Sequence, residues 1–463
     1  QGLAGCGERG MTQPSTPDSL LRREIGRIGV ATIAMNGVIG SGIFALPAVA
    51  IAQAGYFSPW LFLLCGVLIL SVALTLARTA SFFETTGGPI VYTSHAFGRF
   101  VGFQTGLLIY VSRVAAIAAS ANLIVSYAVP IWSPLASGLP RMIAIASYIA
   151  LATILNAIGV RAGMAALYLI SILKLAPLLL LILVGFPDVE WGLVTNANVL
   201  PPEAIGRTML VLLYAFIGFE FSLINAGETR DARSAIPRTL VTTVLAIAVC
   251  YALIQLVAVS VGPDLGGSNA PLNELARRLM GPTGALVLGL GVVFSIGGGS
   301  LTSLLTAPRL TYALSRDGTL PGWFGTVNAR TRVPVNSILF CGALSVAMAV
   351  GQQFVWLATL STFVRLLTYG LCIASLPVIE RTVPAAAGQF RLPGGLAIPC
   401  VALLLTLWLL GQSTIENFAI AGCVVVAGTV GYWLCTRKRA TASEFGSADV
   451  PGRNDRAIND DRA

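Results

Sequence analysis

Long apolar runs recur along the whole chain at a length that suits a lipid bilayer. A hydrocarbon layer of ~30 Å requires about 20 residues of helix, and shorter polar segments separate runs of this length here. The pattern predicts an all-α polytopic membrane protein with twelve transmembrane helices, near residues 26–54, 58–82, 99–128, 141–158, 162–186, 207–226, 238–261, 282–313, 335–351, 353–379, 396–411 and 415–435.

The basic residues lie unequally in the loops between these runs. With the N-terminus inside, 22 of the 29 Lys and Arg residues fall in cytoplasmic segments, and four (Arg141, Arg207, Arg277, Arg278) fall outside. Positive charge is concentrated on the cytoplasmic side of membrane proteins. We therefore expect a cell (cytoplasmic) membrane protein with both termini in the cytoplasm.

The amino-acid composition supports a membrane protein and argues against a soluble domain, a nucleic-acid-binding protein and a metalloprotein. The chain is 56% hydrophobic and 11% charged, whereas a soluble domain has about 25% charged residues. The net charge of +9 does not indicate a nucleic-acid partner, because the basic residues lie between apolar runs and not in a basic stripe with interleaved aromatic residues. The eight cysteines form no CxxC pair or Cys/His cluster. We predict packing roles for the seven that lie in or beside apolar runs, and we expect no metal and no cofactor.

The loops are too short to hold a separate soluble domain. We predict cytoplasmic tails at residues 1–24 and 436–463, and Met11 is a candidate natural start preceded by an extension, residues 1–10. Residues 314–333 are expected at the cytoplasmic interface, and residues 264–280 on the outer side, along the membrane.

Two predicted helices carry signals of interruption. The first contains residues 36–44 (NGVIGSGIF), and the sixth contains residues 214–220 (YAFIGFE) with a carboxylate near mid-span. A glycine cluster alone is also typical of a close-packing face. Interruptions at corresponding positions of two five-helix sets, however, indicate a transport site, because irregular backbone at membrane depth lines a cavity or lies buried in protein.

Four segments together resemble the amino acid–polyamine–organocation transporter superfamily. They are residues 40–44 (GSGIF), residues 84–92 (ETTGGPIVY) followed by 96–98 (AFG), residues 216–220 (FIGFE) with Glu228-Thr229 and Pro237 downstream, and residues 316–321 (RDGTLP). The resemblance implies alternating access and a five-plus-five inverted repeat, with helices 1–5 at 25–186, helices 6–10 at 207–379 and peripheral helices 11–12 at 396–435. Helices 1 and 6 would be discontinuous.

The resemblance also implies a site for an amino acid substrate. The substrate carboxylate would meet main-chain N–H groups around Ser41 and Gly42, and its ammonium group would meet carbonyls near Val38, Tyr214 and Ile217. Tyr214 corresponds to an aromatic gate in relatives, although a mid-helix aromatic residue often only packs. The predicted substrate-binding residues are Val38, Gly40, Ser41, Gly42, Arg113, Tyr214 and Ile217.

Four ionisable residues fall deep within predicted spans, where charge is costly and usually functional: Arg113, Lys174, Glu220 and Arg365. Lys174 resembles a helix-5 lysine that occupies the place of a sodium ion in related transporters, near helix-8 hydroxyls such as Thr302 and Ser303. A buried amine can release and regain a proton, which indicates proton coupling. The alternative is a permanently charged structural tether.

The other deep charges bear on coupling and selectivity. Glu220 is predicted either to take part in proton coupling or to pair simply with Arg113 or Arg365. Arg113 departs from relatives, which usually have an uncharged residue there. Because a pocket arginine repels a cationic side chain, we expect a neutral or acidic substrate.

The leading hypothesis is a proton-linked amino acid symporter. The alternative is a proton-independent amino acid or amine exchanger on the same fold. A membrane enzyme is disfavoured because the only histidine, His95, falls in a loop and no nucleophile–base pair is evident. A sensor is disfavoured because the tails are short.

Overall fold

The computed structural model describes residues 25–83, 87–159, 164–224, 229–384, 389–392 and 394–447. Over these residues the regular structure is helical, and the β contact is an isolated bridge between Ile25 and Thr229. The predicted N-terminal tail, residues 448–463 of the predicted C-terminal tail, and Glu84, Thr85, Thr86 and Glu228 of the motifs lie outside the described residues.

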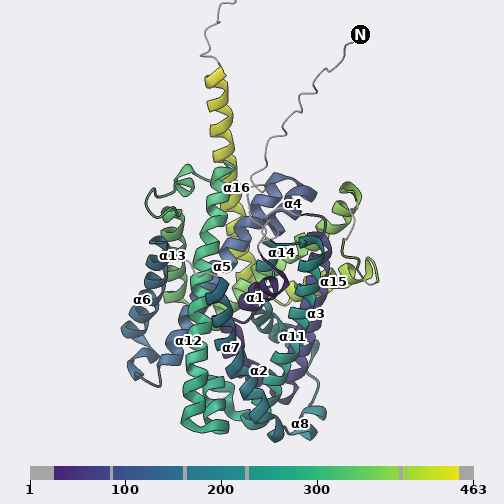
Figure 1. The fold of residues 1–463 in the computed structure, drawn as a ribbon, viewed down its shortest axis with the longest axis vertical. Coiled ribbons are helices and arrows are strands. Elements are labelled where there is room, and N and C mark those ends of the chain that lie inside the picture. The colour runs from purple at the N-terminus through teal and green to yellow at the C-terminus, as the bar shows by residue number, and fades with distance from the viewer. Residues whose placement is uncertain are drawn as a thin grey trace, which may run out of the picture.

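The first half of the chain forms one group of helices (Figure 1). They are α1 (Arg27–Val38), α2 (Ser41–Ala54), η2 (Gly55–Phe57), α3 (Ser58–Ala80), α4 (Pro89–Phe97), α5 (Arg99–Ala128), η3 (Ser133–Ala136), α6 (Gly138–Ala157), α7 (Met164–Gly185), η4 (Phe186–Asp188) and α8 (Trp191–Thr195).

The second half of the chain is also helical. It contains α9 (Pro202–Leu212), η5 (Leu213–Phe216), α10 (Phe221–Ile224), α11 (Ala232–Val261), η7 (Pro263–Gly267), α12 (Pro271–Arg316), η8 (Gly322–Gly325), α13 (Val335–Gly351), α14 (Phe354–Thr382), α15 (Ala397–Gly411) and α16 (Ile415–Ser447).

Eight helical stretches of the described chain are long and apolar enough to cross a membrane, and α13 and α15 are shorter apolar helices. In α6, α7 and α16, only 22%, 33% and 11% of the most apolar 18-residue stretch is buried inside the protein. Their outward side chains include Leu151, Leu183 and Val426, each more than half exposed. An apolar surface this extensive requires lipid as its solvent, which is consistent with the predicted polytopic membrane protein.

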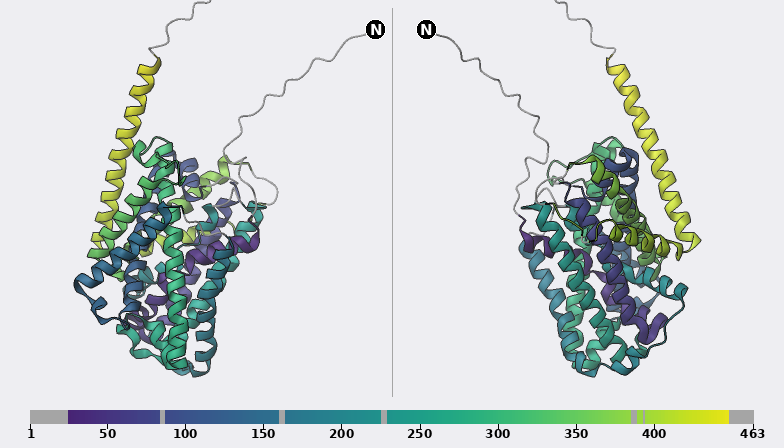
Figure 2. Two further views of the ribbon diagram at one scale, coloured as in Figure 1. Left: turned by 60° about the vertical axis from the view of Figure 1, so that its left-hand side comes forward. Right: turned by 90° about the vertical axis from the view of Figure 1, so that its right-hand side faces the viewer.

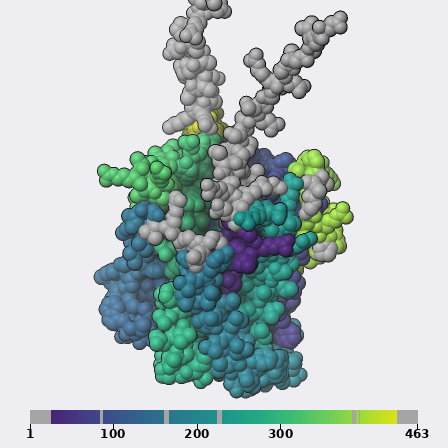
Figure 3. All heavy atoms as spheres, viewed as in Figure 1, coloured from purple at the N-terminus to yellow at the C-terminus, as the bar shows by residue number. Residues whose placement is uncertain are grey.

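The arrangement separates an inner group of helices from outer ones. α1 packs against α7, α10, α11 and α12 and lies near the middle of the molecule (Figure 1). α6 and α13 pack together and form one flank of the space-filling view (Figure 3). α16 runs along the outside and projects beyond the other helices (Figure 2), and it continues past Cys435 to Ser447.

Residues 264–280, expected along the membrane, are largely helical. They include η7 and the first part of α12, which bends sharply at Gly281, where φ is +68°. This left-handed conformation is accessible to glycine and costly for other residues. The sequence Gly281-Pro282 therefore separates a short outer segment from the long apolar part of α12.

The two predicted helix interruptions are present. α1 ends at Val38 and α2 begins at Ser41, with Gly40 at φ −119° and ψ −145° between them. In the second half, α9 tightens into η5, leaves the helical conformation at Ile217 (ψ 141°), and resumes at Phe221 as α10.

Two glycines bring these interruptions into contact. A Cβ added to Gly37 would lie 2.2 Å from the Gly218 carbonyl oxygen, and one added to Gly218 would lie 2.1 Å from the Gly37 carbonyl oxygen. Gly218 also has a φ of +121°. The main chains of the two segments are therefore in direct contact here, and a side chain larger than hydrogen at either position would prevent this contact.

We expect Gly218→Ala to lower the stability of the folded protein by at least about 1–2 kcal/mol, from backbone conformation alone, with the Gly37 contact adding to this. The measurement is the apparent melting temperature of detergent-purified protein. Gly422→Ala, in α16 where an added Cβ meets nothing within 4 Å, is the control and should be neutral. Equal melting temperatures for Gly218→Ala and the control would contradict the proposed contact.

Candidate substrate site

The carbonyl groups at the end of α1 are held by a buried lysine. Lys174, on α7, is 1% exposed, and its Nζ donates to the Ile39 carbonyl at 2.8 Å and to the Asn36 carbonyl at 3.3 Å. The last carbonyls of a helix lack partners within the helix and form its negative end. The ammonium group therefore lies where a cation is most stabilised by this break.

A hydroxyl group of α12 bonds the same carbonyl as Lys174, but it belongs to Ser295 and not to the predicted Thr302. Ser295 of α12 donates to the same Ile39 carbonyl at 3.3 Å, whereas the Thr302 hydroxyl donates to the Gly298 carbonyl of its own helix at 2.9 Å. Ser295, Ile39 and Lys174 thus join α12, the break and α7.

The Val38 carbonyl is already used twice. It accepts from the Gly40 N–H at 2.8 Å and from the Tyr251 hydroxyl of α11 at 3.3 Å. A carbonyl oxygen has two lone pairs, so this arrangement leaves little capacity for a substrate ammonium group at Val38.

A cluster of hydroxyl groups lies at the start of α2. The Ser41 hydroxyl lies 3.0 Å from the Tyr214 hydroxyl and 3.0 Å from the Ser120 hydroxyl of α5. Tyr214 also donates to the Ala116 carbonyl at 3.4 Å. Predicted residues from helices 1 and 6 therefore meet here.

The first turn of α2 offers main-chain donors beside this cluster. The first N–H groups of a helix have no partner within it and attract anions, and Ser41 and Gly42 occupy these positions. A Cβ on Gly40 would meet nothing within 4 Å, so there is open space next to the break. A carboxylate at this position is compatible with the predicted roles of Gly40, Ser41 and Gly42.

The opposite side of the site offers main-chain acceptors. η5 ends at Phe216, and the Ile217 N–H donates back to the Tyr214 carbonyl at 3.4 Å. Gly42 packs closely on Ala215, because a Cβ on Gly42 would lie 2.6 Å from the Ala215 Cα. The carbonyls of residues 213–216 therefore lie near the start of α2.

Glu220 lies in a fully bonded buried network. Its Oε1 accepts from Arg365 Nη1 at 2.5 Å, and its Oε2 accepts from the Tyr369 hydroxyl at 2.8 Å and the Gly218 N–H at 3.1 Å. Arg365 Nε also donates to the Ser112 hydroxyl at 3.2 Å. Of the two predicted partners, Arg365 forms the ion pair.

Arg113 is also buried, at 2% exposure. Its Nη1 donates to the Thr306 hydroxyl of α12, and its guanidinium lies 3.9 Å from the centre of the Phe221 ring. Its Nε and Nη2 have no hydrogen-bond partner in the described part of the chain. Arg113 and Ser120 share a face of α5 two turns apart, about 10.5 Å along the axis, so Arg113 lies beyond the hydroxyl cluster.

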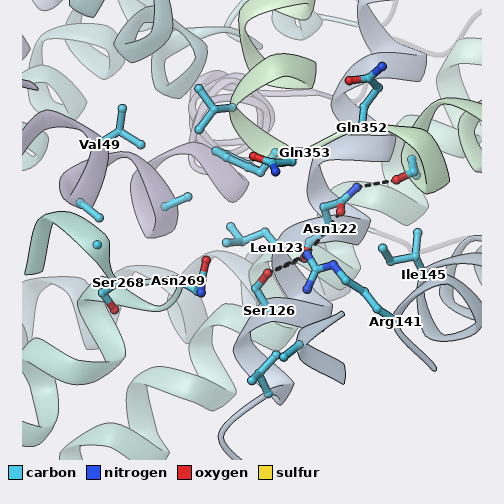
Figure 4. Close-up of a pocket in the computed structure, with 18 of the residues that line it drawn as sticks. Val49, Asn122, Leu123, Ser126, Arg141, Ile145, Ser268, Asn269, Gln352 and Gln353 are labelled. Atoms are coloured by element: carbon cyan, nitrogen blue, oxygen red, sulfur yellow. Dashed lines mark hydrogen bonds between the residues drawn. The ribbon is translucent and has the colours of Figure 1, made fainter. Parts of the chain in front are cut away.

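A cavity of about 530 Å³ opens on the other side of that cluster (Figure 4). It is lined by α2 residues Ala45, Ala48 and Val49, which follow Ser41 by one to two turns, and by Phe354 at the start of α14. The rings of Phe354 and Tyr214 meet edge to face, with centroids 5.7 Å apart. Tyr214 therefore contacts both a residue of the cavity wall and the start of α2.

Sequence reasoning missed several residues that complete the site. Ser120, Tyr251, Ser295 and Tyr369 each bond a predicted residue or a carbonyl of the break. Single hydroxyl residues in apolar helices are common, and nothing in their local sequence distinguishes these from the many that bond their own helix.

Two broken helices meet inside an apolar helical protein, where Gly42 packs on Ala215 and Ser41 contacts Tyr214. Such paired interruptions are typical of membrane transporters. A sequence model described as amino acid permease matches residues 25–429. The chain belongs to this amino acid permease family, and the predicted superfamily resemblance is confirmed.

Individual relatives are similar over nearly their whole length. The serine/threonine exchanger SteT of Bacillus subtilis is 26% identical over 426 residues, covering 90% of this chain and 97% of that protein. The Asc-type amino acid transporter 1 of Mus musculus is 27% identical, covering 88% and 79%. The branched-chain amino acid permease BcaP of B. subtilis is 24% identical, covering 92% and 95%. These relatives are transporters and not enzymes.

We expect Glu220→Gln to cost about 3–5 kcal/mol, because it leaves Arg365 as a buried charge without its partner. The yield of monodisperse protein by size-exclusion chromatography measures this. The double variant Glu220→Gln/Arg365→Gln should recover much of the yield. Arg78→Gln, which breaks the more exposed Arg78–Glu380 pair, is the control and should cost under about 1 kcal/mol. A normal yield for Glu220→Gln would contradict a structural role for the pair.

Proposed function

We propose that this protein is a secondary active transporter that moves amino acids across the cytoplasmic membrane by alternating access. In this proposal twelve spans form a five-plus-five inverted repeat with discontinuous helices 1 and 6, and both termini are cytoplasmic. The observation that carries it is the meeting of the two breaks at Ser41 and Tyr214. There, N–H groups of one broken helix and carbonyls of the other suit the two ends of a zwitterion.

The proposed substrate is neutral or acidic and not cationic. Arg113 has no carboxylate partner in the described chain and shares a helix face with Ser120, so a cationic side chain extending toward it would be repelled. SteT and BcaP are named for serine, threonine and branched-chain amino acids. These names favour neutral amino acids.

The proposed coupling is proton symport through Lys174. Its ammonium group provides a cation at the carbonyls of the break, and loss of its proton would release them. A role for Glu220 in coupling belongs to the same proposal, although its three bonds in this conformation support pairing with Arg365. Exchange without protons is the second candidate, and it is favoured by the similarity to an exchanger, SteT.

Uptake into proteoliposomes tests the function. With a labelled neutral amino acid, we expect competition by neutral amino acids from a panel of twenty amino acids and common diamines, and none by arginine, lysine or diamines. Arg113→Asn should admit cationic competitors. Preferential uptake of arginine over leucine, alanine and glutamate by the unmodified protein would contradict the selectivity proposal.

A second flux measurement tests the coupling. We expect an imposed inward proton gradient to drive uptake into empty vesicles, and Lys174→Met to reduce this stimulated uptake to the level seen without a gradient. Arg207→Gln, at an exposed position on α9, should leave it unchanged. Uptake that requires internal substrate and ignores the gradient would show that the protein is an exchanger.

A further inference from the structure

The cavity beyond Tyr214 contains a cationic side chain without a counter-charge. Arg141 of α6 lines it, and no Asp or Glu is among its lining residues. The partners of its Nη2 are neutral: the Asn122 carbonyl at 3.4 Å, Asn122 Oδ1 at 3.3 Å and the Ser126 hydroxyl at 3.1 Å. In the described part of the chain Arg141 forms no salt bridge, so no carboxylate neutralises its positive charge and this charge can attract an anion.

The acidic residue of η7 is paired with an arginine outside the cavity lining. Asp264 forms a two-pronged ion pair with Arg278, at 2.6 and 2.7 Å, and Arg278 also bonds Glu274 at 3.2 Å. The Arg278 guanidinium lowers the pKa of Asp264 to about 2. Neither Asp264 nor Glu274 lines the cavity, and Arg141 is the charged residue among its lining residues.

The C-terminal end of one helix and the N-terminal end of the next both line the same cavity. α13 ends at Gly351 and α14 begins at Phe354, and residues 349–355 all line the cavity. The N-cap residue of α14, Gln353, forms no side-chain capping bond. The carbonyl end of α13 favours an ammonium group, and the N–H end of α14 favours a carboxylate.

The remaining lining suits an amino acid in size and polarity. Leu123, Met142 and Ile145 contribute apolar side chains to the lining, and Asn269 and Gln352 contribute amides. Figure 4 shows Leu123 and Ile145 on the two sides of the Arg141 guanidinium. A cavity of about 530 Å³ lies within the usual range for small-molecule sites.

From this arrangement we propose that the cavity is an entry site, where Arg141 binds the carboxylate of an amino acid before it passes Tyr214 to the break. This inference rests on the proposed transport function and adds a second, outer binding site to it. Phe354 lines the cavity and contacts Tyr214, so a molecule held here lies against the gate.

The test is protection of an introduced thiol. Gln353→Cys places a cysteine in the cavity wall, and its rate of reaction with a membrane-impermeant maleimide is measured with L-serine or L-serinamide present. We expect L-serine to slow the reaction severalfold and L-serinamide, which lacks the carboxylate, not to slow it. Arg141→Gln should abolish the protection, Arg141→Lys should keep part of it, and Arg207→Gln should leave it intact.

A second variant covers the possibility that Arg141→Gln fails to fold, since Arg141 bonds α5 and the Leu135 carbonyl. Gln352→Glu leaves those bonds in place and adds a carboxylate to the cavity. It should also abolish protection, and it should raise the KM of uptake about tenfold, the usual weight of one charge-assisted hydrogen bond. A purely structural Arg141 predicts no effect of Gln352→Glu.

A variant that blocks the space between the two helix breaks distinguishes a failure of the entry site from a failure of the proposed transport function. Gly42→Val directs a side chain into Ala215 and should stop transport. Protection that persists in this background and disappears with Gln352→Glu supports an independent entry site, whether or not the break is the transport site. Protection that is lost with Gly42→Val, or that L-serinamide matches, overturns the entry site.

Discussion

Unsatisfied main-chain groups at the two breaks are the constraint on which the structure depends. In hydrocarbon each bare N–H or carbonyl costs several kcal/mol, so a helix can be interrupted only where partners are supplied. Here Lys174 and Ser295 bond the Ile39 carbonyl, Tyr251 bonds the Val38 carbonyl, and Glu220 accepts the Gly218 N–H. The first N–H groups of α2, at Ser41 and Gly42, have no partner within their own helix, and in the proposed function they bind the substrate carboxylate.

The same constraint explains why the polar residues of this chain are concentrated at its centre. α5, α7, α11, α12 and α14 each contribute a hydroxyl or a charge to the breaks or to the Glu220 network, while the outward faces of α6, α7 and α16 are apolar. Contact with lipid therefore requires apolar side chains on the exterior of the fold, and the interrupted helices require polar side chains in its interior. The amino acid permease family matched over residues 25–429 is consistent with that division.

The sequence predicted the long apolar helices and the two interruptions, because hydrophobic length and glycine clusters are local signals. The prediction of a loop around His95 was wrong, because Pro89–Phe97 form the helix α4, which is too short to stand out as an apolar run. The break at Gly40, the bend at Ile217 and the burial of Arg113, Lys174, Glu220 and Arg365 follow the expectation. Which residues meet was not predictable in the same way. Three contacts were not predicted: Ser295 with the Ile39 carbonyl, Tyr251 with the Val38 carbonyl, and Phe354 with Tyr214. They depend on how each helix is rotated about its axis, and the order of apolar residues along a buried helix does not determine that rotation.

The Glu220 network has a mechanical consequence. The short segment after the second break is joined through one carboxylate to α14, by Arg365 and Tyr369, and through Arg365 to Ser112 of α5. Pulling that segment away alone would strand opposite charges in a medium that cannot hydrate them. Any rearrangement of the second break is thus constrained to move α10, α14 and this part of α5 together, past α1 at the contact between Gly37 and Gly218.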